Sequence, residues 1–271
     1  MAMKAICIGI NDYPGAGNDL NGCVNDANDW AAELGRRGFE VATLLDRHAT
    51  GAAIRKSIKA LVENGKRGDT IVVQFSGHGS FVPDADGDEP DGTDECICPV
   101  DTRNGYITDD ELFDLYAARE NGVRVVMIAD SCHSGTISKF APITTPPTIE
   151  GQSAPQRKVR FLPPASFLAP RKLTALGTGR ALRRASTPGR HAGLTLSGCQ
   201  DAEYSYDGFF LGRPNGVFSF VALEALKTLP ESATYQDWHG AIRRKLPSRQ
   251  YPQTPNLYGP AAMKTQQIFG R

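Results

Sequence analysis

Short apolar runs that alternate with helical patterns constrain the fold of this chain most strongly. Each run has four to seven residues and is followed by a turn-forming or small polar residue; the runs are Ala5–Ile10, Val41–Leu45, Thr70–Phe75, Val123–Ala129 and Leu194–Ser197. Between and after them, apolar residues recur at helical spacing within 25–34, 50–65, 108–116, 217–226 and 238–246. Buried strands that alternate with helices predict an α/β protein, with a mostly parallel sheet and helices on both faces.

Length and composition indicate a globular enzyme. The 271 residues suit one or two domains, and 40% hydrophobic with 22% charged residues is ordinary for a soluble protein. The apolar runs are far shorter than the ~18 residues of a membrane span, and the first predicted strand starts too early to leave room for a signal peptide. Six unevenly spaced cysteines favour free thiols. We therefore expect a cytoplasmic protein.

The net charge of zero conceals two opposite blocks. Seven of the twelve residues from Asp84 to Glu95 are acidic and none is basic, whereas Phe140–Ala192 carries nine Lys/Arg, one acid and eight prolines. A basic, proline-rich segment buries little apolar surface. We predict a single domain spanning 1–271 with an insert at about 140–192, part of which could dock through Phe161, Leu162, Phe167 and Leu168.

A histidine and a cysteine follow two of the predicted strands. His78 lies in Ser76-Gly77-His78-Gly79 and Cys132 in Asp130-Ser131-Cys132-His133-Ser134-Gly135, and ligands of open α/β sheets bind beyond such strand ends. An imidazole can generate a thiolate and then protonate a leaving amine. The backbone N–H groups of Gly79 and Cys132 are candidates for an oxyanion hole. Taken singly, His78 could be a loop histidine and Cys132 a buried small hydrophobe.

Several motifs in the same order resemble those of metacaspases, the caspase-like cysteine peptidases of bacteria, plants, fungi and protists. Besides SGHG and DSCHSG they are GCVND, DGTDECICPVD, GYITDDEL, SGCQDAEYS, GVFSFVALEAL and QTPNL, within 4–140 and 194–258. The resemblance implies a caspase-like fold with about six strands, Cys132 as nucleophile, His78 as acid/base partner, and cleavage after Arg or Lys. Two alternatives remain open: a Cys–His hydrolase acting on another acyl bond, and a pseudo-protease or scaffold of the same fold.

The resemblance also implies a specificity pocket. Asp26 and Asp130 would supply its negative charge, with Cys23 and Ser76 lining it. Carboxylates suit this task because a buried guanidinium is tolerated only when it is paired and hydrogen-bonded. The alternative for Asp26 is a favourable interaction with a helix N-terminus, for Asp130 stabilisation of its loop, and for Cys23 simple packing.

Calcium is a further implication of the resemblance. Asp94, Asp109 and Asp110 match three positions at which metacaspases bind Ca²⁺, but Lys139 stands at the fourth and would repel a cation. Asp109 and Asp110 also suit the first turn of a helix that starts at Thr108. We expect no required cofactor and leave a calcium site open.

The basic insert suggests that the enzyme acts on itself. A segment rich in Arg and Lys, tethered beside a site specific for those residues, has a high effective concentration there. It could be cleaved or occupy the site as a pseudo-substrate, and the candidates are Arg160, Lys172, Arg180, Arg184 and Arg190. An inert solvated loop is the alternative. We expect peptide or protein substrates with Arg or Lys before the scissile bond, no nucleic-acid or membrane partner, and, by resemblance, a monomer.

Overall fold

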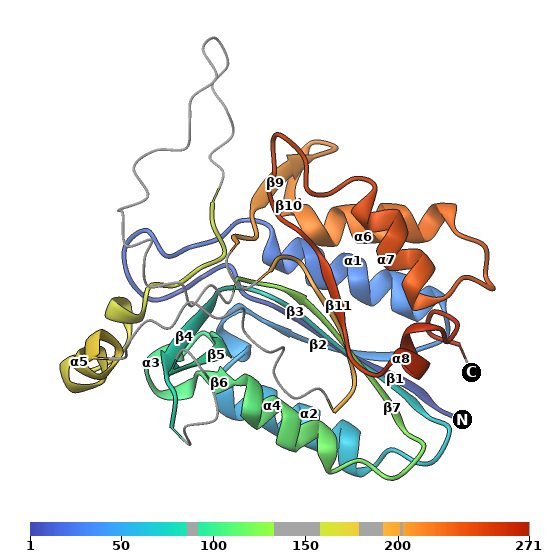
Figure 1. Ribbon diagram of the computed structural model, residues 1–271, viewed down its shortest axis with the longest axis horizontal. Coiled ribbons are helices and arrows are strands. Elements are labelled where there is room, and N and C mark those ends of the chain that lie inside the picture. The colour runs from blue at the N-terminus through green and yellow to red at the C-terminus, as the bar shows by residue number, and fades with distance from the viewer. Residues whose placement is uncertain (86–91, 133–157, 179–191, 201–202, 271) are drawn as a thin grey trace.

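The central element of the protein is a six-stranded sheet (Figure 1). The computed structural model describes residues 1–85, 92–132, 158–178, 192–200 and 203–270. The strands occur in the order β11-β8-β7-β3-β1-β2. Their bounds are β1 Met3–Gly9, β2 Glu40–Leu45, β3 Thr70–Ser76, β7 Arg124–Asp130, β8 Leu194–Ser197 and β11 Asn256–Tyr258. All neighbours pair in parallel except β11, which runs antiparallel to β8. The predicted α/β class with a mostly parallel sheet is confirmed.

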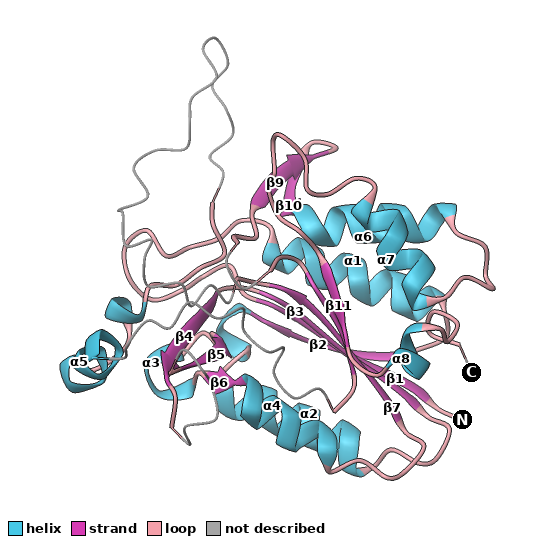
Figure 2. Ribbon diagram, in the orientation of Figure 1, coloured by secondary structure: helices cyan, strands magenta, loops and turns pink. Residues whose placement is uncertain are grey.

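Helices cover both faces of this sheet (Figure 2). One face carries α1 (Cys23–Arg36), α6 (Val217–Thr228) and α7 (Tyr235–Arg243), and the other carries α2 (Gly51–Glu63) and α4 (Asp109–Ala117). Trp30 of α1 meets Trp238 of α7 edge to face at 5.9 Å, whereas Ile54 and Ile58 of α2 belong to a second core beneath the sheet. No helix in the described part of the chain is both long and apolar enough to cross a membrane.

The starts of α2 and α4 follow the local sequence. Thr50 Oγ1 accepts a hydrogen bond from Ala53 N, and Thr108 Oγ1 accepts one from Glu111 N, as expected for N-caps. The Glu111 carboxylate does not return to Thr108; it forms an ion pair with Arg55 of α2. The sequence Thr108-Asp109-Asp110-Glu111 fits a capping box, but only half of it forms, because Arg55 on a neighbouring helix binds the glutamate.

Two smaller β structures stand at the carboxyl ends of the central strands. A three-stranded sheet consists of β4 (Gly79–Pro83), β5 (Thr93–Ile97) and β6 (Ile107–Thr108), and a hairpin consists of β9 (Asp207–Phe210) and β10 (Arg213–Gly216). The sequence did not predict them, because they are two to five residues long and lack a clear apolar alternation. The short helices α3 (Thr102–Gly105) and α8 (Ala261–Lys264) complete the frame.

Part of the basic insert packs onto the domain. Residues 158–178 include a 3₁₀ turn at Pro164–Ser166 and α5 at Pro170–Thr178, a helix that the proline-rich composition did not predict. Leu162, Phe167 and Leu168 are buried in the same core as β4, which confirms that this part docks. Each such side chain contributes about 1.5–3 kcal/mol when fully buried.

Candidate active site

The cysteine and the histidine follow the ends of two neighbouring strands, at the same edge of the sheet. Strands β3 and β7 are neighbours in parallel register, with Ser76 opposite Asp130, and His78 and Cys132 each follow two residues later. Both side chains are buried. The parallel pairing therefore brings together the two residues predicted to perform the chemistry, although they are far apart in the sequence.

The loop before α1 fixes the imidazole of His78. Its Nε2 lies 2.7 Å from the carbonyl oxygen of Asn18, so the network assigns the ring proton to Nε2. Nδ1 is buried and has no hydrogen-bond partner within the described residues. Tyr13 packs against the ring at 4.6 Å, and its hydroxyl accepts a hydrogen bond from His78 N at 2.9 Å. Burial lowers the pKa of His78 to about 4, so Nδ1 carries a free lone pair at neutral pH.

The chain's own Arg160 occupies the space beside these two residues. The carbonyl oxygen of Arg160 accepts hydrogen bonds from Gly79 N at 3.0 Å and from Cys132 N at 3.2 Å. These are the two N–H groups that the sequence proposes for an oxyanion hole. The Arg160–Phe161 peptide bond thus lies where a scissile bond is expected.

The residues before this bond bind as an added β-strand. Arg160 N donates to Ser205 O at 2.9 Å, Asp207 N donates to Lys158 O at 2.8 Å, and Val159 forms an antiparallel bridge with Tyr206. Strand addition of this kind is a common mode of peptide recognition. Ser205 also holds the nucleophile, because its N–H lies 2.6 Å from Cys132 Sγ.

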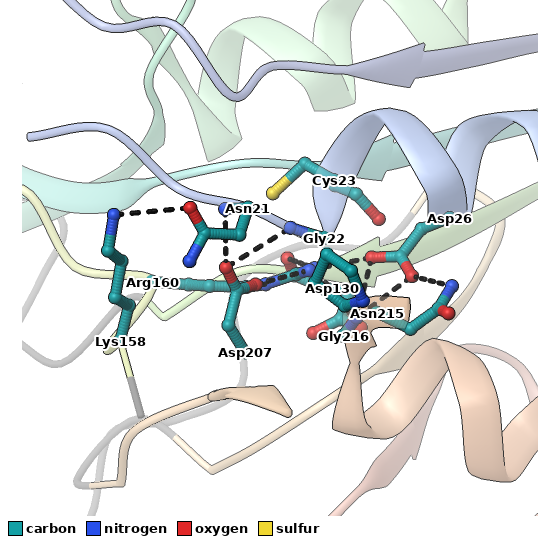
Figure 3. A network of polar contacts seen from close by, with 12 residues as sticks. Asn21, Gly22, Cys23, Asp26, Asp130, Lys158, Arg160, Asp207, Asn215 and Gly216 are labelled. Atoms are coloured by element: carbon teal, nitrogen blue, oxygen red, sulfur yellow. Dashed lines mark hydrogen bonds and ion pairs between the residues drawn. The ribbon is translucent and has the colours of Figure 1, made fainter. Parts of the chain in front are cut away.

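The guanidinium of Arg160 is fully buried among three carboxylates (Figure 3). Nη2 lies 2.6 Å from Asp26 Oδ2, and Nη1 lies 3.2 Å from Asp130 Oδ2. Asp207 Oδ1 accepts from both Nε at 3.0 Å and Nη2 at 2.8 Å. The structure thus gathers the two predicted aspartates and adds Asp207, to which the sequence assigned no role.

The pocket compensates for the cost of burying these charges. A buried charge is tolerated when it is paired and hydrogen-bonded, and Asp26 also accepts hydrogen bonds from Asn215 Nδ2 and Gly216 N at 3.0 and 2.8 Å. Burial raises the pKa of Asp26 to about 6, and the charge of Arg160 opposes that rise. Gly216 leaves room for the guanidinium, because a Cβ there would lie 2.6 Å from Arg160 Cζ.

The other pocket candidates lie close by with different contacts. Cys23 begins α1 beside the guanidinium (Figure 3), and its burial raises the pKa of its thiol while the charge of Arg160 opposes that rise. The Ser76 hydroxyl accepts a hydrogen bond from Gln74 Nε2 at 2.8 Å.

The other cleavage candidates divide into two groups. Lys172 lies outside the site, exposed on α5, where its Nζ donates to the Tyr106 hydroxyl at 2.6 Å. Arg180, Arg184 and Arg190 fall outside the described residues.

The acidic residues considered for calcium gather near β5. Asp94 is buried, with no hydrogen-bond partner for Oδ1 among the described residues, and Asp109 and Asp110 begin α4. Burial, followed by the charges of Asp84 and Asp109, raises the pKa of Asp94 to about 7. Carboxylate oxygens suit Ca²⁺, yet the described residues include no group of three possible ligands that could hold a metal ion. These side chains do not form a metal site as placed, and Lys139 lies outside the described part.

Comparisons with known proteins identify the family of this chain. The family model of the caspase domain matches residues 2–265. This chain belongs to the caspase family. Metacaspase-1B of Aspergillus oryzae is 32% identical to it, over 98% of this chain and 70% of that protein, and Metacaspase-1 of Cryptococcus neoformans is 30% identical, over 98% and 64%. A crystal structure of a protein from Geobacter sulfurreducens superposes with a TM-score of 0.74 at 31% identity, covering 99% of this chain and 98% of that one.

Within the caspase family the relatives place this chain among the metacaspases. The predicted caspase-like fold is confirmed, and the family makes the chain a caspase-like cysteine peptidase. The curated relatives are longer, since the matches span 64–70% of the two metacaspases named above.

Proposed function

We propose that this protein is an Arg-directed cysteine endopeptidase whose first substrate is its own Arg160–Phe161 bond. The observation that carries the proposal is that both the side chain and the carbonyl group of Arg160 are bound in the site. Its side chain lies between Asp26, Asp130 and Asp207, while its carbonyl oxygen accepts hydrogen bonds from Gly79 N and Cys132 N. A pocket that binds the side chain and a pair of donors at the carbonyl are the two elements that acyl transfer at a basic residue requires.

The mechanism assigns the proton transfers to His78. Nδ1 takes the proton of the Cys132 thiol, because Nε2 already carries a proton and donates it to Asn18 O. The thiolate attacks the Arg160 carbonyl carbon, and the N–H groups of Gly79 and Cys132 stabilise the oxyanion. His78 then gives the proton to the nitrogen of Phe161 as the C–N bond breaks, and water hydrolyses the thioester.

The contacts of the pocket favour arginine over lysine. Asp207 binds Nε and Nη2 of Arg160, whereas Asp130 binds Nη1. A lysine ammonium is a single compact donor group and cannot span the same three carboxylates in a fork. Because a hydrogen bond to a charged group contributes about 1.5–3 kcal/mol, we expect Arg peptides to be preferred over Lys peptides by about tenfold to a hundredfold.

Mass spectrometry of the intact chain tests the proposal. We expect wild-type protein to yield fragments 1–160 and 161–271 on incubation, and Cys132→Ala to remain a single chain. Lys172→Gln is the matched control, since this lysine of the same segment lies outside the site. Fluorogenic peptides ending in Arg should be hydrolysed and peptides ending in Asp should not. Hydrolysis of Asp peptides at an equal rate, or identical masses for wild type and Cys132→Ala after long incubation, would contradict it.

A further inference from the structure

The chain that follows Arg160 is anchored in the domain independently of the bond that would be cut. Leu162 N donates to Gly79 O at 3.0 Å, and Ser80 Oγ donates to Leu162 O at 2.6 Å. Phe161 forms a parallel bridge with Gly79, and its ring lies 6.0 Å from that of Phe81. The residues that would hold the leaving group in place are therefore part of β4, directly after the catalytic histidine.

Apolar burial strengthens this anchor further along the chain. Leu162, Phe167, Leu168 and Leu176 are all at least nine-tenths buried and belong to the same core as Val82 of β4. None of these contacts involves Arg160 or the residues before it. Breaking the Arg160–Phe161 bond would thus leave the new amino group of Phe161 beside the thioester on Cys132.

We propose that this tethered amine re-forms the peptide bond, so that the enzyme acts as a ligase at Arg160 as well as a peptidase. The inference rests on the proposed function, since it needs the acyl-enzyme. Its acyl donor is an Arg thioester on Cys132, and its acceptor is the α-amine of Phe161. An ordinary leaving amine diffuses away after acylation; an anchored one competes with water from a position that proximity favours strongly.

The step conserves atoms and charge without any further reactant. In acylation the Cys132 sulfur bonds to the Arg160 carbonyl carbon, the C–N bond to Phe161 breaks, and His78 delivers one proton to the departing nitrogen. In religation the Phe161 amine attacks the thioester carbon, returns that proton to His78, and expels the Cys132 thiolate. The cut becomes permanent only when water or another nucleophile attacks the thioester in place of the amine.

The consequence is that acylation is frequent and net cleavage is slow. A small nucleophile added in solution should capture the acyl-enzyme that would otherwise re-close. Hydroxylamine attacks the thioester carbon, takes the Arg160 acyl group as a hydroxamate, and frees the thiol. Because religation wins over water by proximity, capture should raise the rate of net cleavage by about tenfold or more.

The experiment compares the same acyl group with a tethered and a diffusing leaving group. Full-length wild-type protein is incubated at neutral pH with and without hydroxylamine, and the 1–160 fragment is quantified by mass. In parallel, Arg160→Gly enzyme, shown by circular dichroism to be folded under the same conditions, hydrolyses a Lys-Val-Arg coumarin amide, whose coumarin diffuses away. Cys132→Ala supplies the background, because hydroxylamine can cut Asn-Gly bonds such as Asn64–Gly65 chemically.

We expect hydroxylamine to accelerate cleavage at Arg160 about tenfold, with a hydroxamate on Arg160, and to leave coumarin release nearly unchanged. Ser80→Ala, which removes one anchor of Leu162, should speed cleavage without hydroxylamine. Cleavage at an equal rate with and without hydroxylamine would overturn religation and leave the peptidase intact. If the Arg160–Phe161 bond stays intact in hydroxylamine while coumarin release is normal, religation is contradicted as well. Loss of both reactions would instead contradict the proposed function.

Discussion

In the proposed function, Asp207 is the residue that would distinguish a guanidinium from an ammonium. Its Oδ1 accepts from Nε and Nη2 of Arg160 together, and only arginine offers that pair of donors. Asp207→Asn should lower kcat/KM for Arg peptides about tenfold to a hundredfold and for Lys peptides much less, since one charged hydrogen bond contributes about 1.5–3 kcal/mol.

Asp26→Asn provides the comparison for Asp207. Asp26 lies 2.6 Å from Nη2 alone, a position that a lysine ammonium could also satisfy. Its replacement should therefore lower both activities to a similar extent. Steady-state kinetics on matched Arg and Lys peptides measures the two ratios, and an unchanged Arg/Lys ratio in Asp207→Asn would remove that residue from specificity.

Gly216 sets the depth of the pocket. A Cβ at this position would clash with Asp130 Oδ2 and would lie 2.6 Å from Arg160 Cζ. Gly216→Ala should thus exclude arginine and reduce both self-cleavage and peptide hydrolysis by about a hundredfold, roughly the loss of one or two charged hydrogen bonds. Gly240→Ala is the control, because the nearest atom to a Cβ there is Arg244 Nη1 at 3.8 Å. Equal activity in the two variants would contradict this role of Gly216.

Some of the site residues lie in a recognisable local sequence motif, and others do not. His78, Cys132 and Asp130 could be proposed because each follows a strand pattern in a short glycine- or serine-containing motif. Asp207 could be placed near the substrate cleft but given no role, because it comes from a hairpin without a strand signal and meets the other residues only after folding. Arg160 could be named as a candidate but not ranked, since its selection depends on the backbone hydrogen bonds to Gly79 and Ser205.

At the level of elements, the long strands and helices were predictable and the short ones were not. β3 and β7 are continuous apolar runs, and their parallel register fixes the position of the site. β9 consists of Asp-Gly-Phe-Phe, and β5 contains two acids within five residues, so neither has the alternation that marks a strand. β9 pairs with β10 in a hairpin and β5 pairs with β4 and β6, so both strands depend on pairing and packing rather than on their own residue pattern.

Asp94 of β5 gives a prediction about the stability of the fold. Burial and the neighbouring carboxylates raise the pKa of Asp94 to about 7, so its ionisation opposes folding. Since the folded-state pKa exceeds the unfolded value, the destabilisation is absent below about pH 4 and grows as the pH rises toward 7. Asp94→Asn should therefore raise the melting temperature more at pH 8 than at pH 5.

Two controls accompany the Asp94 measurement. Asp114→Asn, on the exposed side of α4, should change the melting temperature little at either pH. Thermal unfolding of wild type with Ca²⁺ tests whether a cation relieves the same repulsion. If Ca²⁺ binds here, it should raise the melting temperature of wild type at pH 8 and not that of Asp94→Asn. A gain for Asp94→Asn that is equal at pH 5 and pH 8 would contradict the assigned repulsion.

For the molecule as a whole, the net charge of zero is the sum of two parts with opposite net charges. Residues 140–192 carry nine basic residues and one acid, so the remainder of the chain has a net charge of −8. One of those nine bases, Arg160, is buried among three carboxylates of the remainder. The proposed peptidase thus stabilises its own pocket with the residue that it would cleave.

Replacing Arg160 should lower the free energy of unfolding, because the pocket is then left without a cation. Arg160→Gly leaves Asp26, Asp130 and Asp207 without their cation, and breaking one side of a buried ion pair costs about 3–5 kcal/mol. The charge of Arg160 lowers the pKa of Asp26, so its loss raises that pKa further above the unfolded value. The deficit in stability relative to wild type should therefore increase as the pH rises from 5 to 8.

A small guanidinium compound should restore part of the stability that the Arg160→Gly variant loses. Agmatine binding to the folded Arg160→Gly protein should raise its melting temperature, more at pH 8 than at pH 5, because the carboxylates that pair with it are then ionised. Wild type should respond less, since Arg160 already fills the pocket. Lys172→Gly removes an exposed cation from the same segment and should show neither a deficit that increases with pH nor the rescue. Calorimetry in both buffers measures all three proteins, and an Arg160→Gly variant as stable as wild type at pH 8 would show that the three carboxylates do not require a cation.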